Sequence, residues 1–209
     1  MISQCVILAG GLGTRLSAIN DGAPKALTKI LGEPVVEIQI RKLAEAGINE
    51  IVLLLGHKAT QIENYLGDGT AYGVSFRYVI EDEPLGTGGA LVNALPYLND
   101  EFMVVYGDIF FDFCVSDLYR FHKERHAGVS LVIHPNDHPF DSDLVVVDES
   151  CKVLKILPSP HSEKIYYTNL VNAAAYIFQK SVFSDHSYNS SDITKDLLPV
   201  LIAAGVSVF

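Results

Sequence analysis

Short apolar runs alternate with amphipathic segments along most of this chain. Residues 6–9 and 51–55 are apolar without alternation, a pattern typical of strands that are buried on both faces of a parallel sheet. Between these runs, Pro34 opens a segment whose apolar side chains recur at helical spacing, and Gly47 ends it. The pattern therefore predicts a strand, a helix and a second strand in succession.

The alternation continues through residue 134 and predicts strands over 74–80, 102–106 and 129–134 and helices over 61–66, 90–98 and 116–125, with Ser116 as N-cap. Beyond Asp143, two shorter apolar runs flank the turn residues 148–150 and predict a hairpin. A strand over 171–178 and a helix over 192–204, which Pro199 kinks or restarts, complete the pattern. We expect an α/β fold: a Rossmann-like, doubly wound, mostly parallel sheet with a small β-rich insertion.

Composition limits the classes of protein to which the chain can belong. With 209 residues, 49% of them hydrophobic, it is long enough for one large domain over 1–209. The formal net charge of −10 disfavours nonspecific binding of nucleic acid, and no apolar run approaches the length of a membrane span. Three cysteines form neither a disulfide framework nor a metal-ligand spacing, so we expect each to fill core space in a cytoplasmic protein.

The first apolar run ends in a glycine-rich loop. Gly10, Gly11 and Gly13 allow backbone N–H groups to approach a ligand closely, and a nest of such groups attracts anions. Arg15 adds a guanidinium that matches phosphate oxygens, and Lys25 follows Pro24 as a second cation. The loop lacks both the closing Gly-Lys-Ser/Thr of a Walker A motif and the third glycine of a dinucleotide-binding motif. It indicates a polyphosphate ligand.

The order Gly-Gly-x-Gly-Thr-Arg-Leu followed by Pro-Lys resembles the signature of the sugar-1-phosphate nucleotidyltransferases, also called nucleotide-sugar pyrophosphorylases. The resemblance covers essentially the whole chain and looks strongest to the mannose and D-glycero-D-manno-heptose 1-phosphate guanylyltransferases. It implies the nucleotide-diphospho-sugar transferase fold and transfer of a nucleotidyl group from GTP, or another nucleoside triphosphate, to a sugar 1-phosphate. Arg15 and Lys25 would be catalytic, and the nucleotide would be bound by Leu8, Ala9, Gly10, Gly11, Gly13, Thr14, Glu83 and Gly88.

Asp108 is the candidate metal ligand. It follows the predicted strand 102–106 at its carboxyl end, where open α/β sheets place their ligand sites. Mg²⁺ is commonly held by one or two carboxylates together with substrate phosphates, and the resemblance places a Gly-Asp pair at this point. The alternative is a loop aspartate that caps the backbone after it.

Residues 81–90 resemble the nucleobase loop of the family. A carboxylate only accepts hydrogen bonds, so Glu83 could accept both N–H groups on the Watson–Crick edge of guanine, and it is unsuited to uracil. GTP is therefore favoured, although the acidic run 81–83 could also be a solvated strand end. By the same resemblance, Asn172 would bind the sugar; the alternative is a buried amide that completes a strand edge.

Two departures from the family pattern concern the part of the site that would bind the acceptor, the sugar 1-phosphate. Relatives continue past the point that corresponds to Phe209 and carry a second metal-binding aspartate there, so we expect this chain to lack the family's C-terminal end. Ser159 stands where the family has a lysine, which leaves Lys155 or Lys164 as substitutes. A catalytically impaired nucleotide-binding or regulatory domain of a longer bifunctional chain is therefore the alternative, and self-association into a homo-oligomer stays open. A CTP-dependent enzyme that acts on a phosphorylated alcohol is a third hypothesis, which Glu83 disfavours.

Overall fold

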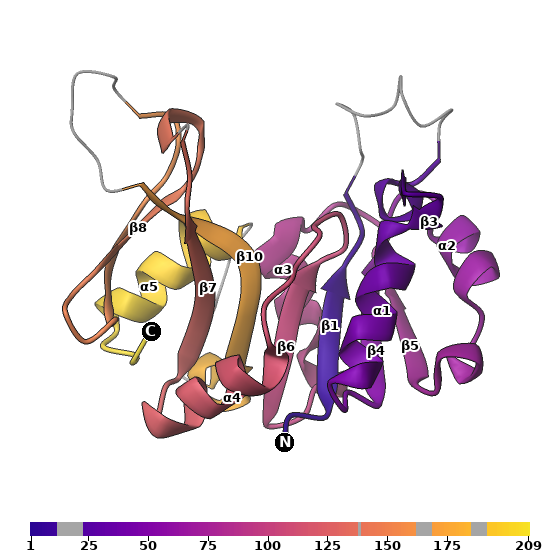
Figure 1. Ribbon diagram of the computed structural model, residues 1–209, viewed down its shortest axis with the longest axis horizontal. Helices are drawn as coiled ribbons and strands as arrows, with labels where there is room; N and C mark the ends of the chain where they lie inside the picture. The colour runs from indigo at the N-terminus through magenta and orange to yellow at the C-terminus, as the bar shows by residue number, and fades with distance from the viewer. Residues whose placement is uncertain (12–22, 138, 162–168, 185–191) are drawn as a thin grey trace.

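The computed structural model describes residues 1–11, 23–137, 139–161, 169–184 and 192–209, and its centre is one eight-stranded mixed sheet (Figure 1). Four strands are parallel, in the order β5 (Ser75–Ile80), β4 (Glu50–Leu55), β1 (Gln4–Leu8) and β6 (Glu101–Tyr106). The long strand β10 (Leu170–Gln179) runs antiparallel to β6 and also pairs with β7 (Val129–Pro135). The predicted fold class is confirmed.

Helices cover both faces of the sheet, and the described ones are α1 (Val35–Glu45), α2 (Ala59–Leu66), α3 (Gly86–Ala94), α4 (Val115–Glu124) and α5 (Leu198–Ala203). Because successive side chains of a strand point to opposite faces, β1 contributes Val6 to one core and Ile7 to the other. Ile40 of α1 belongs to the same hydrophobic core as Ile7. Leu91 of α3 and Leu201 of α5 belong to the other core, which contains Val6. These two fully buried layers make the sheet a rigid platform for the loops at its ends.

The predicted hairpin is present as β8 (Leu144–Val147) and β9 (Val153–Leu157). It does not form a separate body, because Leu144 of β8 pairs with Val171 of β10 and so extends the main sheet. A second, small sheet joins β2 (Lys29–Ile30) to β3 (Glu33–Pro34) just before α1. The last residues, 206–209, lie beside β7, where Val208 forms a parallel bridge with Val129.

Several local predictions need correction. Helix α3 begins at Gly86, four residues before the predicted start, and α4 has Cys114 and not Ser116 at its N-cap position. Cys5 fills the core as expected, but Cys114 and Cys151 are exposed. At Pro199 the chain does restart, because a π-helical turn, Ile193–Leu197, precedes α5. Among the described residues, no helix has the length and apolar character to cross a membrane.

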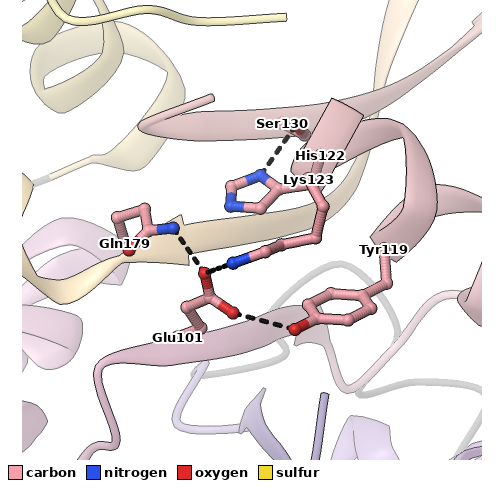
Figure 2. A network of polar contacts seen from close by, with 6 residues as sticks. All are labelled: Glu101, Tyr119, His122, Lys123, Ser130 and Gln179. Carbon is pink, nitrogen blue, oxygen red and sulfur yellow. Dashed lines mark hydrogen bonds and ion pairs between the residues drawn. The ribbon is translucent and has the colours of Figure 1, made fainter. Parts of the chain in front are cut away.

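A polar network joins β6, α4 and β10 (Figure 2). The carboxylate of Glu101 accepts hydrogen bonds from Lys123 Nζ at 2.6 Å, Gln179 Nε2 at 2.5 Å and Tyr119 Oη at 3.0 Å. Beside it, the fully buried His122 ring shares a 2.9 Å hydrogen bond with Ser130 through Nδ1. Its Nε2 atom has no hydrogen-bond partner within the part of the chain that the structure describes. The network ties α4 to the sheet away from the loop-bearing edge.

Burial lowers the pKa of His122 from 6.5 to about 4. Between these values the unfolded chain binds the proton more readily than the folded chain, so this residue makes stability fall as the pH drops through that window. Between pH 7 and pH 5 we expect the free energy of unfolding to fall about 2 kcal/mol more in the parent chain than in His122→Gln. Urea unfolding at the two pH values measures this difference. The exposed His134 supplies the control, His134→Gln, which should behave like the parent; equal pH dependence of the parent and His122→Gln would contradict the assignment.

Candidate active site

A cavity of about 330 Å³ opens at the carboxyl ends of β1, β4 and β6. This is where parallel α/β sheets place ligands, because the loops that follow neighbouring strands meet there. Six of the residues predicted from the sequence line it: Leu8, Ala9, Gly10, Gly11, Lys25 and Asp108. Five residues of the stretch 81–90, which was expected to form the nucleobase loop, line it too: Glu81, Pro84, Gly86, Thr87 and Ala90. The remaining lining residues were not named individually as site residues: Ala26, Leu54, Tyr106 and Gly107.

Close backbone packing shapes the floor of the cavity. The N–H of Gly107 donates to Leu8 O at 2.8 Å, which continues the β1–β6 pairing past the end of the strands. A side chain at Gly107 would meet Ala9 Cβ at 3.0 Å, and one at Gly56 would meet Gly10 O at 3.0 Å. A Cβ at either position would be crowded, and the neighbouring backbone or side chain would have to move by a few tenths of an ångström to admit it.

Lys25 and Asp108 face each other in the cavity. Lys25 lies in a short 3-10 turn, Lys25–Leu27, and its Nζ atom is 3.5 Å from Asp108 Oδ2. The two side chains are 29% and 42% exposed, so the pair contributes no more than about 1 kcal/mol and can open at small cost. The lysine could then take a phosphate oxygen and the aspartate a cation.

Whether the cavity suits a divalent metal depends on the oxygen atoms that the phosphates of a bound ligand would add to its side chains. Among residues 1–11, 23–137, 139–161, 169–184 and 192–209, no group of three or more His, Cys, Asp or Glu side chains could hold a metal ion. Asp108 lines the cavity together with Gly10 and Gly11 and offers one carboxylate there, which would suit Mg²⁺ only if phosphate oxygens and water completed its shell. This matches the requirement of a site for a metal–nucleotide complex.

Of the two carboxylates at residues 81 and 83, the structure places that of Glu81 in the wall of the cavity. Glu81 follows β5 directly, lines the cavity, and accepts a hydrogen bond from Leu85 N at 3.2 Å. Partial burial raises the pKa of Glu81. Glu83 is exposed and Gly88 is buried, and neither lines the cavity. The sequence did contain a signal for Glu81: it directly follows a predicted parallel strand, and such residues lie at the edge of the sheet where ligands bind.

Asn172 lies outside the cavity lining, in a polar cluster next to it. Its Nδ2 donates to Tyr176 Oη at 2.5 Å and to Thr194 Oγ1 at 2.8 Å. The ring of Tyr176 packs against that of Tyr106, with centroids 6.3 Å apart, and Tyr106 lines the cavity. Burial raises the pKa of Tyr106, so both rings stay neutral phenols at physiological pH. The amide predicted to bind sugar is thus one layer away from the cavity wall.

Other predicted residues fall elsewhere. Arg15, Gly13, Thr14 and Lys164 lie outside the described residues. Ser159 is held by Asp143, whose Oδ1 accepts from Ser159 N at 2.9 Å and from Ser159 Oγ at 3.2 Å, and Lys155 is exposed on β9.

The fold and the position of the cavity define a Rossmann-like α/β protein whose ligand site lies at the carboxyl edge of a parallel sheet. The model of the nucleotidyl transferase family matches residues 4–208, and the chain belongs to this family. The match agrees with the resemblance inferred from the glycine-rich loop.

Individual relatives are similar over most of this chain. A mannose-1-phosphate guanylyltransferase of Mycobacterium tuberculosis is 32% identical over 97% of this chain and 56% of its own length. A D-glycero-alpha-D-manno-heptose 1-phosphate guanylyltransferase of Campylobacter jejuni is 34% identical over 87% of this chain and 78% of its own. The structure of HddC from Yersinia pseudotuberculosis complexed with GMP-PN matches with a TM-score of 0.79 at 27% identity, over 95% of this chain and 86% of that one.

The chain spans about half the length of several curated relatives that it matches. Its relatives also include a uridylyltransferase, so membership of the family does not by itself decide the base.

Proposed function

We propose that this chain is a Mg²⁺-dependent sugar-1-phosphate guanylyltransferase, which converts GTP and a mannose-type or manno-heptose-type sugar 1-phosphate to GDP-sugar and pyrophosphate. The observation that carries the proposal is the Lys25–Asp108 pair, 3.5 Å apart in a cavity floored by the Gly10–Gly11 backbone. A cation, a carboxylate and a glycine loop together suit a metal-bound polyphosphate. The guanylyltransferase names of similar proteins support the choice of reaction.

In the proposed reaction, a phosphate oxygen of the sugar 1-phosphate attacks the α-phosphorus of GTP, and pyrophosphate leaves in line. Lys25 would neutralise charge that develops on the α-phosphate, and Arg15 and the glycine loop would neutralise the leaving pyrophosphate. Mg²⁺, when bound, would be held by Asp108 and phosphate oxygens and would reduce the repulsion between the two anionic substrates. The protein thus contributes positioning and electrostatics and takes no covalent part.

The base and sugar specificities rest on separate residues. For the base we propose Glu81 in place of Glu83, because Glu81 lines the cavity and its carboxylate can accept from guanine N–H groups. For the sugar, Asn172 stays the candidate. It is linked to the cavity wall indirectly, because it donates a hydrogen bond to Tyr176, whose ring packs against that of Tyr106. We further propose that residues 1–209 act as a single nucleotidyltransferase domain. The transferase names of the relatives favour this function over a regulatory domain without turnover.

Pyrophosphate release by the purified chain tests the proposal. GTP, UTP, CTP and ATP are each combined with mannose, glucose and manno-heptose 1-phosphates in the presence of Mg²⁺. The expected result is turnover with GTP and one mannose-type acceptor. Turnover with a different triphosphate alone would refute the guanylyl assignment, and GTP binding without any turnover would favour the impaired domain.

A further inference from the structure

Gln39 is a polar residue on the buried face of α1, and its side chain reaches the loop that follows β6. The residue is 1% exposed. Its Nε2 donates to Tyr106 O at 2.8 Å and to Ile109 O at 2.6 Å. These two carbonyls flank Gly107 and Asp108, so one amide group bridges both ends of the segment that carries the candidate metal ligand.

Apolar packing does not explain an amide at this position. Gln39 Oε1 is buried without a hydrogen-bond partner among the described residues, which costs about 1 to 3 kcal/mol. A methionine of similar length would fill the same space without that penalty, although it would leave the two carbonyls without the amide. The distinctive contribution of Gln39 is therefore the pair of hydrogen bonds to the loop.

Asp108 depends on its backbone for position. Its side chain is 42% exposed, and its Oδ2 atom lies 3.5 Å from Lys25 Nζ. A carboxylate with so little packing around it is placed mainly by the dihedral angles of its own segment, which the bridge from Gln39 restrains. The same helix also contacts the lysine side of the site, since Val35 N donates to Thr28 O at 2.9 Å, just after the Lys25–Leu27 turn.

One turn further along α1, a second side chain extends this attachment. Lys42 Nζ donates to Phe111 O at 3.0 Å and pairs with Asp112 Oδ1 at 2.7 Å. Gln39 and Lys42 are three residues apart and share one face of the helix. Together they attach the stretch 106–112 to a rigid helix.

We propose that Gln39 is a positioning residue for Asp108: its amide fixes the backbone of 106–109 so that the carboxylate meets the metal and Lys25 in productive geometry. This inference rests on the proposed function, because it assigns a role within the same reaction. Gln39 is not part of the cavity lining, so its proposed role is exerted through Asp108.

The test compares Gln39→Met with Gln179→Met, a matched change in the network around Glu101, away from the cavity lining. Gln39→Met should lower kcat and raise the Mg²⁺ concentration needed for half-maximal rate, each roughly tenfold, with KM for GTP within about twofold of the parent. Gln179→Met should leave all three within about twofold, even if it lowers the urea midpoint equally. Equal kinetic effects of the two variants, or a change in stability alone, would overturn the proposal.

A second measurement separates this inference from the proposed function. Hydrogen exchange of residues 106–110, measured without nucleotide or metal, should be at least about tenfold faster in Gln39→Met than in the parent. If hydrogen exchange of residues 106–110 is the same in Gln39→Met as in the parent, the proposal for Gln39 is overturned, even if the parent is active. An inactive parent would instead refute the proposed guanylyltransferase activity, and the exchange rates would still decide the role of Gln39.

If Gln39→Met does not fold, Lys42→Met provides a second test, because it loosens the same stretch from a partly exposed position. Lys42→Met should also raise the Mg²⁺ concentration needed for half-maximal rate, and an unchanged concentration would contradict the proposed attachment of residues 106–112 to α1.

Discussion

Asp108→Asn is expected to lower kcat for pyrophosphate release about 10² to 10³-fold. The substitution keeps the size of the side chain but removes the negative charge that would hold Mg²⁺ beside the phosphates. An amide oxygen is a much weaker partner for a hard divalent cation than a carboxylate is, so the metal–nucleotide complex would be poorly placed for attack. The amide also removes the charged partner of Lys25.

The expected loss lies mainly in kcat, because the glycine loop and the basic residues would still bind the triphosphate. Steady-state rates over a range of GTP and Mg²⁺ concentrations separate the two effects. Asp117→Asn is the matched control, since Asp117 is an exposed residue of α4 that pairs with Arg120. It should stay within about twofold of the parent. A loss for Asp108→Asn no larger than that of the control would show that this carboxylate does not hold the metal.

Glu81→Gln is expected to lower kcat/KM for GTP about 10 to 100-fold and to narrow or reverse the preference for GTP over UTP. A carboxylate can accept from two guanine donors, whereas the amide presents one acceptor and a donor that opposes the second guanine N–H. Loss of one charge-assisted hydrogen bond in a partly buried pocket is worth about 1.5 to 3 kcal/mol. Uracil offers one donor and carbonyl acceptors, which the amide of glutamine can satisfy.

The matched control for this prediction is Glu83→Gln. Glu83 is exposed and lies outside the cavity lining, so its substitution should leave the ratio of kcat/KM for GTP and UTP within about twofold of the parent. The opposite outcome, with Glu83→Gln switching the base and Glu81→Gln having no effect, would restore the original sequence-based assignment of Glu83.

The order of strands and helices could be predicted because buried parallel strands are uninterrupted apolar runs, as residues 51–55 illustrate. The start of α3 could not be predicted, since Gly86, Gly88 and Gly89 disfavour helix on their own. Tertiary contacts override that preference: Thr87 Oγ1 accepts from Ile193 N at 2.9 Å, a partner more than a hundred residues away.

That Gly10 and Asp108 line one cavity could be predicted, because each follows the end of a neighbouring parallel strand. Lys25 lines the same cavity from the Lys25–Leu27 turn, and it was expected there as the cation that follows Pro24. The choice between Glu81 and Glu83 depends on strand register, which the sequence alone does not show. Glu81 N donates to Leu55 O at 2.9 Å, so this residue continues the pairing of β5 with β4 and faces the cavity. The role of Gln39 had a visible signal, namely a polar residue three positions after Val36 on the apolar face of a helix.

The most direct test of the central claim follows the α-phosphate of GTP. The purified chain is incubated with Mg²⁺, a mannose-type sugar 1-phosphate and GTP labelled at the α-phosphorus, and the products are separated by chromatography. We predict that the label appears in a GDP-sugar, with one pyrophosphate released for each molecule formed. Label that stays in GTP, or that appears in GMP, would contradict guanylyl transfer to a sugar phosphate.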